Sequence, residues 1–193
     1  LPKVTLDGVF NSRPAILSDN IAGLVDIVHY VYGKGHRKIA VIHGEDTSVT
    51  QKRLASFRST CAKLGVDVPD EYVKGALYHD PRASGLATRE LLSLSNRPTC
   101  ILYPDDFSFI GGMNEIERQG LSIPEDVSVV GYDGILLSQV LRPRLTTYRQ
   151  DAVTMGTKAA ESLIDIIEHP LTSLPMQIMV PGQLWEGATV KAL

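Results

Sequence analysis

The sequence predicts an α/β protein built on a doubly wound parallel sheet. Helix and strand patterns alternate along most of the chain, and the strands are short and apolar. Helical stretches separate successive strands, and this arrangement requires right-handed crossovers between parallel strands. The 193 residues are 44% hydrophobic and 21% charged, which is typical of a globular chain that buries a core without disulfides or metals.

The first third of the chain predicts a helix, a strand and a second helix. Residues 19–32 place their large apolar side chains on one helical face, with Ser18 or Asp19 as the N-cap. Residues 38–43 (KIAVIH) form a short buried strand. Residues 49–64 repeat apolar side chains at helical spacing, and the glycine that follows ends this helix.

The middle of the chain repeats this pattern. Residues 72–77 predict a weaker strand, and the Asp-Pro pair at 80–81 opens the next helix. A strand over 99–103 and a helix over 107–120 follow. Residues 126–132 (DVSVVGY) are the clearest buried strand. The span from the first helix to this strand is sufficient for one doubly wound lobe.

Two pieces do not fit that lobe. A strand over 3–7 is followed by loop-like residues, and a helix over 151–168, capped by Asp151, follows an extended stretch at 145–148. One strand and one helix cannot cover each other's apolar faces. We therefore expect them to belong to a second lobe whose other strands lie outside this chain. A last extended pair follows at residues 177–180 and 184–190.

Composition and motifs exclude several classes of function. The net charge of −3 argues against strong nucleic-acid binding by this chain itself. Cys61 and Cys100 do not form a zinc motif, and so few cysteines are typical of a reducing compartment. No apolar run approaches the roughly 18 residues of a membrane span, and no signal peptide opens the chain. We expect a cytoplasmic protein.

Motifs of enzymes are also missing from the sequence. It has no dinucleotide fingerprint, P-loop, nucleophile elbow or His-Glu-x-x-His pair. We therefore expect no enzyme activity, no catalytic residue, no cofactor and no metal.

The carboxyl ends of the predicted strands converge on one edge of the sheet, where ligands bind in open parallel sheets. The candidate ligand-binding residues there are Arg53, Asp105, Phe107 and Asp133, with Thr47 and Tyr78 as weaker candidates. One arginine, carboxylates and aromatic faces suit a neutral polyol such as a sugar. Phosphates fit poorly beside two aspartates. In the alternative interpretation, the aspartates that follow strands cap helices and Arg53 pairs with an acid.

Specific runs of sequence resemble the LacI/GalR family of bacterial transcription regulators. The strongest is IPEDVSVVGYD at residues 123–133, followed by PRLTTYRQ at 143–150. GHRKIA at 35–40, the Arg53-Leu54-x-x-Phe57 stretch and Met155-Gly156 fit as well. The resemblance covers nearly the whole chain in the right order.

The resemblance implies a sensor core of the periplasmic-binding-protein-like type I fold. Residues 16–147 and 180–193 would form the C-terminal lobe, and residues 1–15 and 148–179 part of the N-terminal lobe. The remaining N-terminal lobe and a helix-turn-helix headpiece would lie outside this chain. The family also implies a homodimer that binds operator DNA through the headpiece and a small-molecule effector between the lobes.

The resemblance also assigns roles to residues. Arg53 matches the family's effector-binding arginine, and Asp133 matches its effector-binding aspartate. Asp105 stands where the family usually has asparagine, and Phe107 occupies the next ligand-facing position. The aromatic residue of many members is not clearly matched, since Tyr78 lies two residues before its expected place.

We therefore expect the effector-sensing and dimerisation core of a transcriptional regulator that binds a sugar. Effector contacts with both lobes would change their relative angle and so control operator binding. The alternatives are a periplasmic sugar-binding protein of a transporter and an α/β enzyme. The run at 123–133 and the cysteine content favour the regulator.

Overall fold

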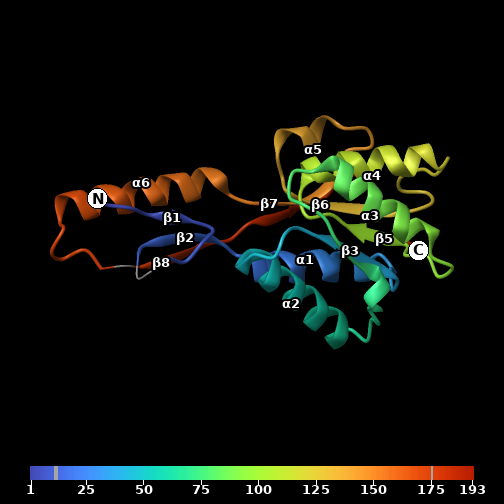
Figure 1. The fold of residues 1–193 in the computed structure, drawn as a ribbon, viewed down its shortest axis with the longest axis horizontal. Helices are drawn as coiled ribbons and strands as arrows, with labels where there is room; N and C mark the ends of the chain where they lie inside the picture. The colour runs from blue at the N-terminus through green and yellow to red at the C-terminus, as the bar shows by residue number, and fades with distance from the viewer. Residues whose placement is uncertain (11–12, 175) are drawn as a thin grey trace.

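The computed structural model describes residues 1–10, 13–174 and 176–193 and distributes their strands between two sheets (Figure 1). We call the six-stranded sheet with its covering helices the large lobe. The three-stranded sheet with its single helix is the small lobe. The two lobes lie end to end, so the molecule is elongated.

The large lobe confirms the doubly wound fold. Its sheet has the order β4-β3-β5-β6-β7-β9, and its first five strands are parallel. The strands are β3 (Ile39–His43), β4 (Val73–Gly75), β5 (Cys100–Leu102), β6 (Ser128–Asp133), β7 (Thr146–Arg149) and β9 (Gln183–Trp185). The last strand, β9, runs antiparallel to β7, so the sheet is mixed at this edge. Of the extended stretch expected over 184–190, only the start pairs as a strand, and Ala188 and Thr189 make single backbone hydrogen bonds to Arg144 and Val129.

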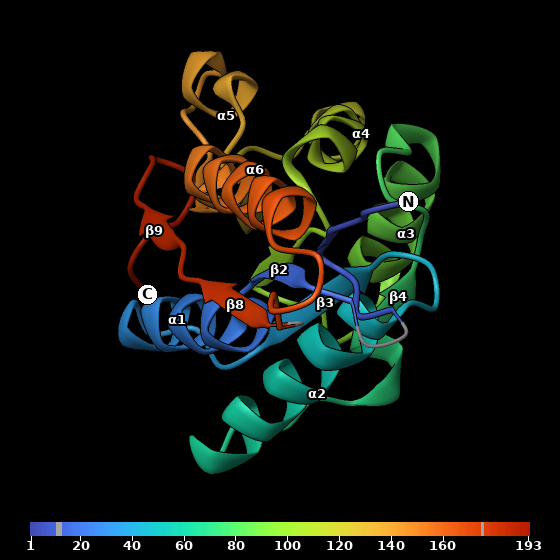
Figure 2. The ribbon, with the colours of Figure 1, turned by 90° about the vertical axis from the view of Figure 1, so that its left-hand side faces the viewer.

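Helices cover both faces of the large sheet, as Figure 2 shows in a view from the small lobe. They are α1 (Asn20–Gly33), α2 (Ser48–Lys63), α3 (Pro81–Ser93) and α4 (Asp106–Arg118), with a 3-10 turn at Asp70–Tyr72. Alternate residues of β3 point to opposite faces. Ile39 and Val41 pack with α1 and α2, whereas Ala40 and Ile42 pack with α3 and α4. This two-sided burial explains why the strands are continuous apolar runs.

Side-chain caps fix where the helices begin. Asp19 and Asp80 accept hydrogen bonds from the backbone N–H groups three residues on, at 2.9 and 3.0 Å, and Asp151 does the same at 3.0 Å. These three predicted caps are confirmed. The stretch after β6 was expected to be a loop, but it contains the short helix α5 (Leu136–Val140). Ile135 precedes α5 and provides no side-chain cap.

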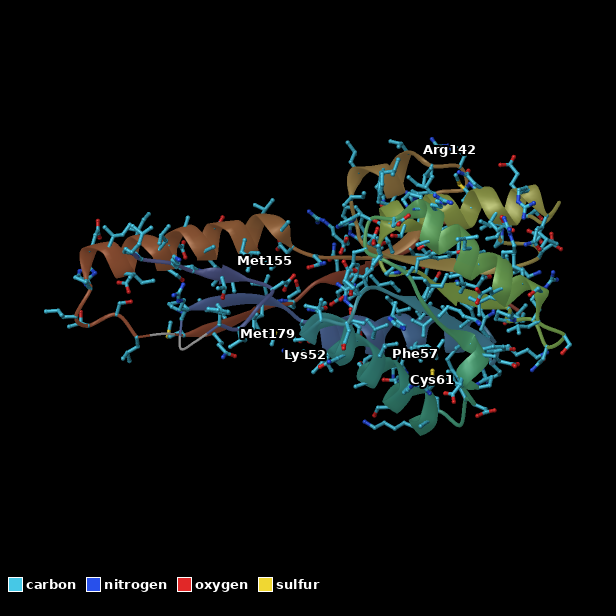
Figure 3. The ribbon with its side chains drawn as sticks, in the orientation of Figure 1. Lys52, Phe57, Cys61, Arg142, Met155 and Met179 are labelled. Carbon is cyan, nitrogen blue, oxygen red and sulfur yellow. The ribbon has the colours of Figure 1, made fainter. Side chains whose placement is uncertain are left out.

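The small lobe combines segments from both ends of the chain. Its parallel sheet has the order β1-β2-β8, from β1 (Thr5–Leu6), β2 (Ala15–Ser18) and β8 (Gln177–Val180). Helix α6 (Ala152–Glu168) lies on this sheet, and the side chain of Met155 on α6 is labelled in Figure 3. Met155 packs on Ile16 and Val180. In the structure the first strand and this helix lie together in the small lobe, apart from the large sheet.

Two details of the predicted organisation are wrong. Residues 15–18 were expected to be a loop ending in a crossing, but all four pair with β8. The boundaries expected at 15/16, 147/148 and 179/180 fall inside β2, β7 and β8, although each of these strands pairs within a single sheet. The chain passes between the lobes at Asp19, at residues 150–151 and at residues 181–182, which we call the crossings.

No helix in the described ranges is both long enough and apolar enough to cross a bilayer.

Candidate functional site

The carboxyl ends of β3, β5 and β6 lie at the edge of the large sheet that faces the small lobe (Figure 1). A narrow pocket of about 30 Å³, with room for little more than a water molecule, lies beside this edge. Its wall is mostly apolar and includes Thr50, Arg53, Tyr78 and Tyr132. Of the predicted ligand-binding residues, Arg53 and Tyr78 line this pocket, whereas Thr47, Asp105, Phe107 and Asp133 do not.

Arg53 is held in the pocket wall by neutral partners. Its Nε donates a hydrogen bond to Oδ1 of Asn20 at 2.8 Å, and a terminal nitrogen donates to the Pro104 carbonyl at 3.0 Å. The guanidinium carbon lies 3.6 Å from the centre of the Tyr132 ring, a cation–π contact. Within the described structure, no carboxylate forms an ion pair with Arg53. The alternative that Arg53 merely pairs with an acid is therefore not what the structure shows.

Asp133 ends β6 in a conformation that is uncommon for residues other than glycine. Its φ is +95°, and the next residue, Gly134, has φ +66°. Its Oδ1 accepts a hydrogen bond of 2.5 Å from Nε2 of Gln150. Burial raises the pKa of the Asp133 carboxyl, and the nearby Arg53 guanidinium opposes that rise. Asp133 and Arg53 are thus electrostatically coupled at one edge of the sheet.

Asp105 is engaged by its own chain. The side chain is 1% exposed and caps α4, with Oδ1 accepting from the Ser108 N–H at 2.7 Å. Its Oδ2 accepts from the Ser108 hydroxyl at 2.8 Å and from the His79 N–H at 3.0 Å. The helix-cap alternative therefore describes this carboxylate as it stands. A role for Asp105 in ligand binding stays a prediction.

The other three candidates lie in different environments. Thr47 caps α2, with its hydroxyl oxygen accepting from the Thr50 N–H at 3.2 Å. Tyr78 lines the pocket, and its hydroxyl lies 2.9 Å from the hydroxyl of Thr50. Phe107, on the first turn of α4, is 43% exposed and is not part of the pocket wall. Of these three, the structure brings only Tyr78 close to Arg53, with 5.8 Å from ring centre to guanidinium carbon.

The buried carboxyl of Asp106, which is not the cap of α4, joins three elements beside the site. Asp106, at the start of α4, is fully buried, and its oxygens accept from the Thr147 hydroxyl at 2.6 Å and the Ile135 N–H at 2.9 Å. Burial raises its pKa to about 7. Asp106 therefore links the start of α4 to β7 and to the loop after Asp133.

Sequence reasoning missed two amide side chains that orient the site. Asn20 follows the first crossing and holds Arg53, and Gln150 lies in the second crossing and holds Asp133. Gln150 ends the quoted run at 143–150, which was a signal, whereas nothing marked Asn20.

The chemistry of this site is that of hydrogen bonding. Arg53 offers a donor fork and Asp133 an acceptor, both partly buried at one edge. Among the described residues, no three His, Cys, Asp or Glu side chains gather where they could hold a metal ion. The arrangement suits a polar ligand that carries both donors and acceptors, as hydroxyl groups do.

Comparison with known proteins gives a consistent family. Residues 28–190 match the model of the periplasmic binding protein-like domain. The "Probable HTH-type transcriptional repressor ExuR" of Bacillus subtilis is 34% identical over 176 residues, which cover 89% of this chain and 52% of that protein. The repressor CytR of Escherichia coli is 32% identical over 178 residues, covering 91% and 52%. The chain thus spans about half the length of these curated relatives.

Solved structures of regulators share the fold. A LacI family transcriptional regulator from Mycobacterium smegmatis superposes with a TM-score of 0.87 at 25% identity, covering 98% of this chain and 70% of that chain. The complex of the transcriptional regulator CelR with cellobiose superposes with a TM-score of 0.88 at 25% identity, covering 96% and 58%.

Proposed function

We propose that this chain, which belongs to the periplasmic binding protein-like domain family, binds a small sugar between its two lobes. Within that family it is the effector-binding core of a LacI/GalR-type regulator. The observation that carries the proposal is the pair Arg53 and Asp133. Both lie at the sheet edge that faces the small lobe, and an amide side chain from the region of a crossing orients each of them.

The charges near the site favour a neutral ligand. Asp133 lies within electrostatic range of both Arg53 and a second carboxyl, Asp105, so a doubly anionic phosphate bound there would be repelled as well as attracted. A sugar hydroxyl accepts from the guanidinium and donates to the carboxylate without adding charge. The solved complex of the regulator CelR contains cellobiose, which supports a sugar as the class of effector.

The whole protein would act through DNA. Its curated relatives are transcriptional repressors, and they are about twice as long as this chain. We infer a cytoplasmic homodimer in which a headpiece outside this chain binds the operator. Sugar binding changes the angle between the lobes, and that change biases the headpieces toward one of two arrangements.

A thermal-shift screen of the full-length protein tests the proposal. The panel holds monosaccharides and disaccharides, including ribose and cellobiose, with phosphorylated metabolites and purines as controls. A ligand at about 100 times its Kd adds roughly 2.7 kcal/mol of stability. A shift with a sugar that is lost in Arg53→Ala supports the proposal. A shift with only a phosphorylated compound or a purine contradicts the neutral-sugar assignment.

A further inference from the structure

Four side chains form a hydrogen-bonded chain between the two lobes. Gln150 donates from Nε2 to Oδ1 of Asp133 at 2.5 Å, and its Oε1 is in contact with the Ser18 hydroxyl. The same hydroxyl lies 2.8 Å from Oδ2 of Asp7, whose Oδ1 accepts from the Ser18 N–H at 2.6 Å. These hydrogen bonds therefore connect the candidate site to the small lobe through adjacent side chains.

The members of this chain come from different rigid parts. Asp133 ends β6 of the large lobe, whereas Ser18 ends β2 of the small lobe and Asp7 follows β1. Gln150 stands in the crossing between β7 and α6 and is the one member that touches both sides. Asp7 and Asp133 both have positive φ, +49° and +95°. Uncommon backbone conformations thus stand at both ends of the chain.

The hydrogen count makes this contact sensitive to the distance between the lobes. The Gln150 amide donates to the Asp133 carboxylate, so its carbonyl oxygen faces Ser18. The Ser18 hydroxyl has one proton and two acceptors within reach, Gln150 and Asp7. The Ser18 hydroxyl can donate its proton to only one of these acceptors at a time. A small displacement between the lobes determines which acceptor receives the hydrogen bond. Two hydrogen-bonding states are therefore available to one set of residues.

We propose that Gln150 is a positioning residue that couples the orientation of Asp133 to the angle between the lobes. When the Ser18 proton is donated to Gln150, the amide is held in place and presents Asp133 toward the ligand. When that proton is donated to Asp7, Gln150 and Asp133 are released together. The inference rests on the proposed function for the role of Asp133, but its mechanical part does not require a ligand.

The mechanical part is measured as a distance between the lobes. Spin labels are placed on exposed positions of the full-length protein, with Ser59→Cys on α2 of the large lobe and Thr157→Cys on α6 of the small lobe. Both native thiols of this chain, Cys61 and Cys100, are buried, and burial raises the pKa of both, so the exposed introduced cysteines react faster than these two. Double electron–electron resonance then gives the distribution of distances between the two spin labels in the absence of added sugar.

Three variants separate the coupling from general damage. Gln150→Ala and Ser18→Ala each break the link, and we expect both to broaden or shift the distance distribution. Gln119→Ala is the matched control, because Gln119 donates to Glu115 at 2.8 Å entirely within the large lobe. We expect it to leave the distribution unchanged. Gln150→Ala and Ser18→Ala distributions that coincide with that of the control overturn the proposal.

A second readout places the effect at the site. With cellobiose and ribose as probes in calorimetry, we expect Gln150→Ala to weaken the binding of the active sugar by about tenfold or more. Ser18→Ala removes the proton that holds Gln150, so we expect it to weaken binding in the same direction. Affinities in both variants that equal the affinity of the parent contradict positioning through Asp133. If the parent protein binds neither sugar, the choice of effector fails, and the distance measurement still decides the coupling.

Discussion

Replacing Asp106 by asparagine should change how the stability of the protein depends on pH. In the unfolded chain an aspartate ionises near its ordinary pKa of 3.8, whereas burial raises the pKa of Asp106 in the folded protein to about 7. Between these two values, ionisation of this carboxyl favours the unfolded state. The free energy of unfolding therefore falls as the pH rises toward 7 and does not change further above it.

The size of this effect follows from the difference between the two pKa values. Each unit corresponds to about 1.36 kcal/mol, so integration from about pH 5 to about pH 8 gives a loss of roughly 2 to 3 kcal/mol from this one group. Asparagine stays neutral and fits the site. The asparagine oxygen can accept from the Ile135 N–H, and the asparagine amide can donate to the Thr147 hydroxyl. The Thr147 hydroxyl then accepts a hydrogen bond, whereas in the parent it donates one to Asp106.

Urea unfolding followed by circular dichroism at about pH 5 and about pH 8 measures the difference. We expect the free energy of unfolding of the parent to fall by roughly 2 to 3 kcal/mol relative to that of Asp106→Asn over this interval. Asp126→Asn is the control, since Asp126 is an exposed carboxylate of the same lobe. Parallel pH profiles for the parent and Asp106→Asn would refute the assigned burial effect.

Other predictions concern the site and the core. Arg53→Ala should weaken sugar binding by about 1.5 to 3 kcal/mol in calorimetry, and the control is Arg58→Ala, which changes an exposed arginine on the same helix. If Arg53→Ala and Arg58→Ala bind the sugar with equal affinity, Arg53 does not contact it. Gly23→Ala should lower the free energy of unfolding by roughly 1 to 3 kcal/mol, because the added methyl would overlap the Tyr132 hydroxyl; an unchanged urea midpoint would contradict this. Thr47→Ala removes the side-chain cap of α2 and should lower the free energy of unfolding by about 1 kcal/mol. We expect it to shift the midpoint of urea unfolding less than Gly23→Ala does.

Local patterns predicted the order of helices and strands because local physics determines them. Apolar runs such as 38–43 are buried on both faces, and caps such as Asp80 are formed within three residues of the chain. Strand β2 was missed because its pairing is not local. Its four residues follow a proline and pair with 177–180, so nothing near them in the sequence reports the partner.

The candidate site was predicted only in part for the same reason. Arg53 and Asp133 follow strands at the expected edge, and the topology places them there. The partners that orient them lie far along the chain, since Asn20 is 33 residues from Arg53 and Gln150 is 17 residues from Asp133. Whether an aspartate caps a helix or faces a ligand depends on such contacts, as Asp105 shows.

The sparse burial of α6 has a consequence for hydrogen exchange. Of the residues of this helix, all of which the structure describes, only Met155 is buried, and it packs on Ile16 and Val180. In this 193-residue chain on its own, few apolar contacts hold α6 against local opening, so its amides should exchange with solvent faster than those of α1, which buries six residues. A ligand that contacts both lobes binds only when the small lobe is folded, so it lowers the population in which α6 is locally unfolded. Binding should therefore be recorded as slower exchange in α6, far from the residues that touch the ligand.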